Sequence, residues 1–284
     1  MLKKIFFAAA LLLASELNAK PVVIASIAPV EYLAKAVGGD KIEVQSLAKG
    51  DVHSYEPKPN DMKAVAKARI FIAAGLEFEE AWIPRFKASA KNLVVVKSDA
   101  KIAKLKEERG EQAEHDEKHE AHADPHVWLN PMLAITMARN ISDALIDMDK
   151  ANKDFYLENF QKLMNDLLAF DESAKESLAG LKNRKFVVYH PAWGYFAAHY
   201  DLEQISIERS GKEPKIDEMA STLKMIKDEN IKVIFADPNR SQKSAQILAS
   251  QTGAKVELLD PLGYNLLENL KIAVGAIKDA NSPK

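Results

Sequence analysis

The stretch that decides the fold runs from Asn152 to Leu181 and reads NKDFYLENFQKLMNDLLAFDESAKESLAGL. Apolar residues recur along it at every third or fourth position, the spacing that gathers them on one face of an α-helix. They are Tyr156, Phe160, Leu163, Leu167, Phe170, Ala174, Leu178 and Leu181. A helix of this size extends roughly 45 Å, which is longer than most helices of globular proteins. We therefore expect one long, rigid helix, over residues 150–182, that connects two lobes.

On both sides of this helix, short β-branched runs alternate with amphipathic stretches, a pattern typical of a parallel sheet covered by helices. Before the helix, strands are predicted at 22–27, 42–47, 69–74 and 93–96. After it, they are predicted at 186–189, 205–207, 232–236 and 256–259. The sequence thus predicts an α/β protein with two lobes, at 20–149 and 183–284, each built on a parallel sheet flanked by helices.

The first 19 residues have the features of a signal peptide. Lys3 and Lys4 precede an apolar run from Ile5 to Ser15, and Ala19 offers a small residue for cleavage. The run is too short to span a bilayer, which takes about 20 residues. Without cysteine the chain has neither a structural disulfide nor an attachment point for a thioether-linked lipid. We expect residues 1–19 to be a cleaved signal peptide and the mature protein to be periplasmic.

The overall composition excludes some partners. The chain has 284 residues and a formal charge of -2, without the basic excess that nucleic-acid binding requires. Its length is sufficient for two domains. We expect a monomer that does not bind nucleic acid.

Four residues at post-strand or linker positions stand out, because ligands of open parallel sheets gather beyond the carboxyl ends of the strands. They are His53, His126, His190 and Asp260. Two come from each half of the chain, so lobes packed face to face could bring all four into one inter-lobe cleft. Three imidazoles and one carboxylate suit a tetrahedral Zn²⁺ ion. Each residue alone also has an ordinary interpretation: a histidine at the surface, or for Asp260 a turn or helix cap.

Residues 107–124 form a His-acidic loop, rich in glutamate and aspartate. Its three histidines, His115, His119 and His122, could share one face of a transient helix and hold a second, weakly bound metal ion. A solvated loop without function is the alternative. His199, in a predicted helix, is expected to be structural or at the surface.

Four segments resemble the metal-site motifs of one protein family: VHSYEP at 52–57, DPHVWLNP at 124–131, YHPAWGYF at 189–196 and LDPLG at 259–263. The family is that of the periplasmic zinc-binding proteins of ABC transporters, within the group that binds zinc or manganese. The resemblance covers the whole mature chain. It implies that His53, His126, His190 and Asp260 bind the metal, and that the protein captures Zn²⁺ and delivers it to an inner-membrane permease driven by an ATPase.

The resemblance also bears on the choice of metal. Manganese-type members of the family typically have a glutamate where this chain has His190, and exchanging a carboxylate for an imidazole favours zinc. The first alternative is a manganese or iron carrier of the same fold. The second is a periplasmic zinc hydrolase in which Asp260 acts as a base, and the third is a carrier of an organic solute.

We expect a binding protein, not an enzyme. Four protein ligands close the zinc shell, whereas a catalytic zinc keeps one position open. The sequence has no His-Glu-x-x-His helix, no Gly-rich phosphate loop and no Gly-x-Ser-x-Gly elbow. With one stiff connection between the lobes, we expect metal release to follow a local rearrangement of the loops that carry His126 and Asp260. Zinc affinity should fall once the pH drops below about 6.5, the ordinary pKa of histidine.

Overall fold

The computed structural model describes residues 20–106, 123–208 and 216–281. The predicted signal peptide, residues 1–19, lies outside the described residues. So does nearly all of the His-acidic loop, including His115, His119 and His122.

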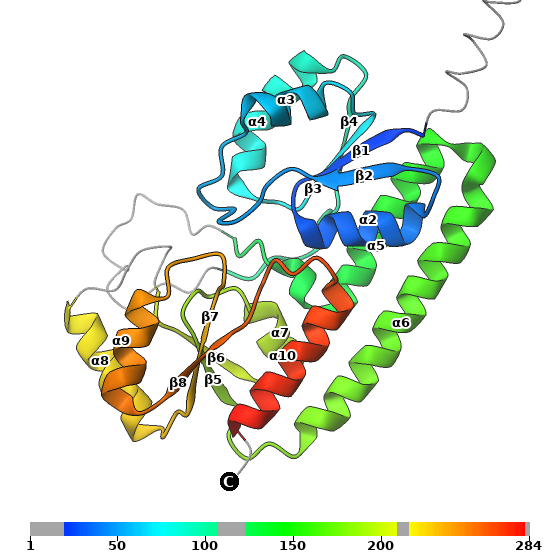
Figure 1. Ribbon diagram of the computed structural model, residues 1–284. Coiled ribbons are helices and arrows are strands. Elements are labelled where there is room, and N and C mark those ends of the chain that lie inside the picture. Colours follow the sequence, from blue (N-terminus) through cyan, green and yellow to red (C-terminus); the bar gives the residue numbers. More distant parts are fainter. Residues whose placement is uncertain (1–19, 107–122, 209–215, 282–284) are drawn as a thin grey trace, which may run out of the picture.

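The N-terminal lobe is built on four parallel strands in the order β2-β1-β3-β4 (Figure 1). The strands are β1 (Val22–Ala25), β2 (Glu43–Ser46), β3 (Ile70–Ala73) and β4 (Val94–Lys97). The helices of this lobe are α2 (Ala28–Gly38), α3 (Pro59–Val65) and α4 (Glu77–Ser89). The two central strands, β1 and β3, are continuous apolar runs because helices cover both faces of the sheet.

The C-terminal lobe repeats this arrangement, with strand order β6-β5-β7-β8. Its strands are β5 (Lys185–Val188), β6 (Glu203–Ser206), β7 (Val233–Ala236) and β8 (Lys255–Leu258). Its helices are α7 (Gly194–His199), α8 (Ile216–Asp228), α9 (Lys243–Thr252) and α10 (Leu266–Asn281). The predicted fold class, two α/β lobes with parallel sheets, is confirmed.

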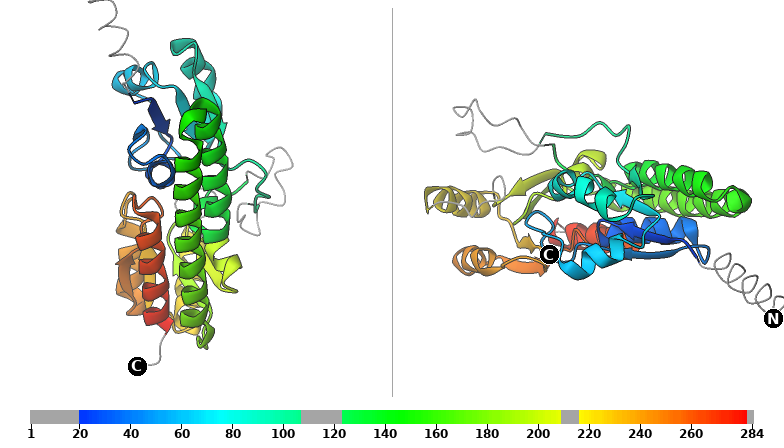
Figure 2. Two further views of the ribbon diagram at one scale, coloured as in Figure 1. Left: turned by 90° about the vertical axis from the view of Figure 1, so that its right-hand side faces the viewer. Right: turned by 90° about the horizontal axis from the view of Figure 1, so that it is seen from above.

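The long helix is α6 (Lys153–Ala179), which follows α5 (Pro131–Met148) and a short 3₁₀ turn, Lys150–Asn152. It runs alongside both lobes, with α5 and α10 beside it (Figures 1 and 2). Its predicted apolar face is buried from Tyr156 to Leu178. The single helical connection between the lobes is therefore as expected, while the limits given above, at 149/150 and 182/183, stay predictions.

The main apolar core is continuous from one lobe to the other. One cluster of buried residues includes Ile24 of β1, Leu167 of α6, Phe186 of β5 and Leu270 of α10. A smaller cluster around Ile234 belongs to the C-terminal lobe alone. Because α6 and α10 bury apolar surface against both lobes, separating the lobes would expose that surface to water.

No helix within residues 20–106, 123–208 and 216–281 has the length and apolarity needed to cross a membrane.

Candidate metal centre

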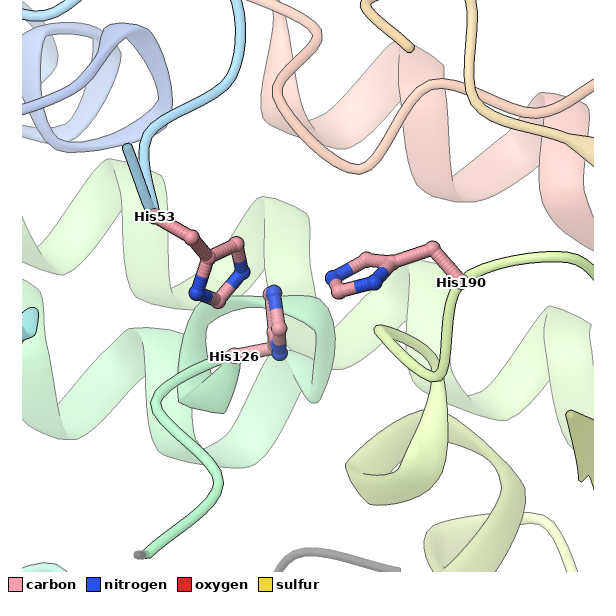
Figure 3. A group of neighbouring side chains, drawn as sticks. All are labelled: His53, His126 and His190. Atoms are coloured by element: carbon pink, nitrogen blue, oxygen red, sulfur yellow. The ribbon is translucent and has the colours of Figure 1, made fainter. Parts of the chain in front are cut away.

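Three histidines from distant parts of the chain meet between the lobes (Figure 3). One ring nitrogen from each of His53, His126 and His190 lies within 4.8 Å of the corresponding nitrogens of the other two. The ring centroids of His53 and His190 are 5.0 Å apart, and that of His126 is 5.3 Å from each of them. The structure thus brings together three of the four residues named from the sequence.

Local structure explains why each imidazole reaches this point. His190 follows the last residue of β5 by two positions, and β5 is next to β7, where the strand order of the sheet reverses direction. Ligands of open α/β sheets bind at such positions. His126 begins a buried 3₁₀ turn, Val127–Leu129, which leads into α5. His53 lies in the loop between β2 and α3.

In two of the imidazoles, the Nδ1 atom lies close to a carboxylate oxygen. The Nδ1 atom of His126 is 2.8 Å from Oδ1 of Asp124, and Nδ1 of His190 is 2.9 Å from Oε2 of Glu208. A carboxylate that accepts a hydrogen bond from Nδ1–H fixes the tautomer in which Nε2 carries a free lone pair. The His126 ring is therefore held in the state that a metal ion requires, whereas Nδ1 of His190 lies close to both the Glu208 carboxylate and the Arg240 guanidinium.

The Nε2 atoms of His53 and His190 are buried, and neither has a hydrogen-bond partner among the described residues. A buried polar atom without a partner costs about 1–3 kcal/mol. The same atoms belong to rings that face one another, so a shared cation would satisfy both at once. Among the features of this cluster, these unpartnered nitrogens point most directly to a ligand.

The surroundings keep these imidazoles neutral. Burial, together with the neighbouring His126 and His190 and the cation of Arg240, lowers the pKa of His53 to about 3. Burial, His126 and Arg240 likewise hold the pKa of His190 well below its ordinary value. A neutral imidazole is the form that binds a metal ion, so protons compete weakly for these two sites at neutral pH.

A partly buried arginine, Arg240, lies beside the cluster. Nη1 of Arg240 is 2.6 Å from Oε2 of Glu208 and 2.7 Å from Nδ1 of His190, and Nη2 is 3.3 Å from Oδ2 of Asp51. Asp51 accepts a hydrogen bond from the backbone N–H of His53. Arg240 therefore connects the loop of one clustered histidine, His53, to the carboxylate that contacts another, His190.

Asp260, the fourth residue named from the sequence, is not part of the group of ligand atoms that lie within 4.8 Å of one another. Its Oδ1 accepts hydrogen bonds from Nδ2 of Asn239, at 2.8 Å, and from the backbone N–H of Leu262, at 2.9 Å. The structure places it after β8, in a turn next to the 239–240 loop. Its role as a ligand stays a prediction.

Four residues of this centre had no separate role in the sequence analysis: Asp51, Asp124, Glu208 and Arg240. A partial signal existed for Glu208, since it comes directly after a predicted strand, where polar residues are candidates. Asp124 is part of a quoted motif. Nothing in the spacing of Arg240 and Asp51 indicates that they meet, because they are 189 positions apart.

His199 has the structural role expected of it. Its Nε2 lies 2.6 Å from Oδ1 of the buried Asp171, which joins α7 to α6.

The chain is similar to known zinc-uptake and metal-binding proteins. A Bacillus subtilis (strain 168) protein, the high-affinity zinc uptake system protein ZnuA, is 30% identical over 279 residues, which cover 91% of this chain and 86% of that protein. A Treponema pallidum (strain Nichols) protein named for metal binding is 34% identical over 253 residues, 86% of this chain and 80% of that one.

Solved structures are similar over almost the whole chain. A crystal structure of ZnuA superposes with a TM-score of 0.87 at 34% identity, and covers 93% of this chain and 100% of its own. A ZnuA deletion mutant with zinc bound has a TM-score of 0.86, also at 34% identity, with coverage of 94% and 100%. Residues 23–280 match the family described as "Zinc-uptake complex component A periplasmic". The chain therefore belongs to this family of zinc-uptake components, which are binding proteins and not enzymes.

Proposed function

We propose that the protein captures Zn²⁺ with high affinity in the periplasm and delivers it to an inner-membrane ABC permease driven by its ATPase. The observation that carries this proposal is the cluster of three imidazoles, with buried and unpartnered Nε2 atoms on His53 and His190. Membership of the zinc-uptake family supports the same function.

The proposed ligands are Nε2 of His53, His126 and His190, with the carboxylate of Asp260 as the fourth. Asp260 already uses Oδ1 to accept two hydrogen bonds. Its other oxygen, Oδ2, is the atom that would bind the ion. A tetrahedral shell of three nitrogens and one oxygen is complete for zinc and leaves no open position.

The donor set supports zinc over manganese or iron. Imidazole is a borderline ligand that suits Zn²⁺, whereas Mn²⁺ favours carboxylate and carbonyl oxygens. Three of the four proposed donors are nitrogens. A manganese carrier of this fold would gain from a carboxylate at position 190, where this chain has an imidazole.

Export and assembly complete the proposal. Residues 1–19 would direct the chain to the periplasm and be removed there, and the mature chain, with lobes at 20–149 and 183–284 joined by the helix at 150–182, would act as a monomer. His115, His119 and His122 would form a second metal site that binds more weakly.

The test is elemental analysis of protein purified without added metal, followed by calorimetric titration with zinc. One tightly bound zinc per chain is expected, and His53→Ala, His126→Ala and His190→Ala should each abolish or greatly weaken binding. Wild-type affinity in all three variants would refute the site. Competition dialysis addresses the choice of metal: a zinc protein retains Zn²⁺ against a large excess of Mn²⁺, and loss of zinc there would favour the manganese carrier.

A further inference from the structure

The three imidazoles are not held equally firmly. The segment of His126 is fixed to the C-terminal lobe on several sides: Nε1 of Trp128 donates to the carbonyl of Pro261 at 2.8 Å, and Oη of Tyr195 donates to the carbonyl of Asp124 at 2.8 Å. The side chain of Trp128 is fully buried. His126 therefore moves only if this packed interface moves.

His190 is also fixed, because it continues directly from the sheet of the C-terminal lobe. The backbone N–H of Tyr189 donates to the carbonyl of Phe235 on β7, and the N–H of Glu208 donates to the carbonyl of Tyr189. The carboxylate of Glu208 then holds the ring itself. His126, although it comes from the N-terminal half of the chain, is thus fixed against the C-terminal lobe and forms one preorganised pair with His190.

His53 approaches this pair from the other lobe, on a loop. It is more exposed than the other two imidazoles. Within the loop, Asp51 accepts hydrogen bonds from the N–H of His53 at 3.2 Å and from Oγ of Ser54 at 3.1 Å, so the carboxylate shapes the turn that carries the ligand. Whatever holds Asp51 also positions His53.

Arg240 holds Asp51 from across the cleft. One guanidinium nitrogen pairs with Glu208 of the C-terminal lobe, and the other pairs with Asp51 of the N-terminal lobe. The Arg240 side chain is 15% exposed and that of Glu208 6%, so solvent screens this pair poorly, whereas Asp51 is 31% exposed and its pair with Arg240 is more open to salt. A planar fork with two terminal nitrogens can serve two carboxylates at once, which a lysine ammonium on a flexible stem does less well.

We propose that Arg240 is a positioning residue for zinc capture, which clamps the His53 loop onto the C-terminal lobe through Asp51 and so sets the rate at which zinc leaves the site. This inference rests on the proposed function. It places the opening of the site at the His53 loop, and not at the loops of His126 and Asp260 where the sequence led us to expect it. The His126 loop is anchored by the buried Trp128, whereas the His53 loop contacts the opposite lobe through an ion pair of which Asp51 is 31% exposed.

The test is the rate of zinc release from the full-length mature protein, measured by stopped flow into an excess of chelator. Asp51→Asn keeps an oxygen to accept from His53 but removes the charge that pairs with Arg240. We expect it to accelerate release about tenfold, within the range of coupling between contacting charged residues. Arg240→Gln should accelerate release at least as much, and the double variant no more than Arg240→Gln alone.

Two further measurements separate positioning from general stability. Release from the wild type should accelerate with ionic strength, because salt screens the partly exposed pair, and release from Asp51→Asn should not. Arg139→Gln is the matched control: it also removes an arginine from an aspartate pair, but on the exposed face of α5, and should leave the rate unchanged.

Three results would overturn the proposal: a release rate of Asp51→Asn within twofold of the wild type, multiplicative effects in the double variant, or equal salt dependence of the wild type and Asp51→Asn. If Arg240→Gln does not fold, Asp51→Asn and its salt dependence still decide. A wild type that binds no zinc would instead refute the proposed function, so the two failures are distinguishable.

Discussion

The carboxylate of Asp124 binds the segment of His126 twice: its Oδ1 lies 2.8 Å from Nδ1 of the ring and accepts the backbone N–H of the same residue at 2.9 Å. Both residues are buried, with 6% and 4% of their surface exposed. One oxygen therefore fixes both the backbone and the tautomer of one of the three clustered imidazoles.

Asp124→Asn should weaken zinc binding about 10- to 100-fold, the usual effect of losing a carboxylate behind a metal-binding histidine. Asparagine keeps the shape and can still accept the backbone N–H, but it presents no negative charge to the imidazole. Competition against a chelator of known affinity measures the loss. An unchanged dissociation constant would show that the carboxylate does not tune the ring.

The histidines divide into two groups by their contacts. His199→Gln should lower the free energy of unfolding by about 1–2 kcal/mol, because it weakens a hydrogen bond to the buried, charged Asp171. It should leave zinc affinity intact. His126→Gln, in contrast, should abolish tight zinc binding. Urea unfolding of the zinc-free proteins and calorimetry give the two quantities, and a loss of zinc affinity in His199→Gln would contradict this division.

Helix α6 offers two adjacent leucines in opposite environments. Leu167 is fully buried in the core shared by the lobes, and Leu168 is 37% exposed. Leu167→Ala should lower the free energy of unfolding by about 2–5 kcal/mol. Leu168→Ala should change it by about 0.5 kcal/mol. Equal losses measured by urea unfolding would mean that the apolar face of the helix does not hold the lobes together.

The sequence predicts α6 and both sheets well because their signals are local. The apolar period of residues 156–178 defines which face of the helix is buried, and the β-branched runs define the strands. His190 could be named because polar residues after parallel strands converge, and all three imidazoles could be named because the motifs around them resemble those of a known family. The pairing of Arg240 with Asp51 could not be foreseen, because it depends on how the two lobes meet and involves residues without a local pattern.

The continuous core predicts a small response of overall shape to zinc. Leu167 of α6 and Leu270 of α10 belong to one buried cluster with residues of both sheets, so a large hinge motion would expose apolar surface. Small-angle scattering of the metal-free and zinc-loaded protein should give the same radius of gyration within error. A clear decrease in the radius of gyration on zinc addition would indicate a closing motion of the lobes and would contradict this prediction.

The lowered pKa values of His53 and His190 should make zinc affinity less sensitive to acid than it would be with ordinary histidines. Three ordinary histidines would each weaken zinc binding about tenfold for every pH unit below about 6.5. With the pKa of His53 at about 3 and that of His190 far below normal, protons compete less, so affinity between pH 6.5 and 5 should fall less steeply than this limit. Chelator competition at several pH values measures the slope, and a loss as steep as for three ordinary imidazoles would contradict it.

The same shift affects the stability of the zinc-free protein with a definite sign. The folded-state pKa of His53 is lower than the unfolded value of about 6.5, so between those two values the unfolded chain binds more protons. This group therefore does not reduce the free energy of unfolding above pH 6.5, and it reduces that free energy progressively as the pH falls toward 3. His53→Gln removes the titrating group, so the variant should lose less stability than the wild type between pH 7 and pH 5. Thermal unfolding of both proteins across this range tests the sign, since identical losses would mean that His53 titrates normally in the folded state.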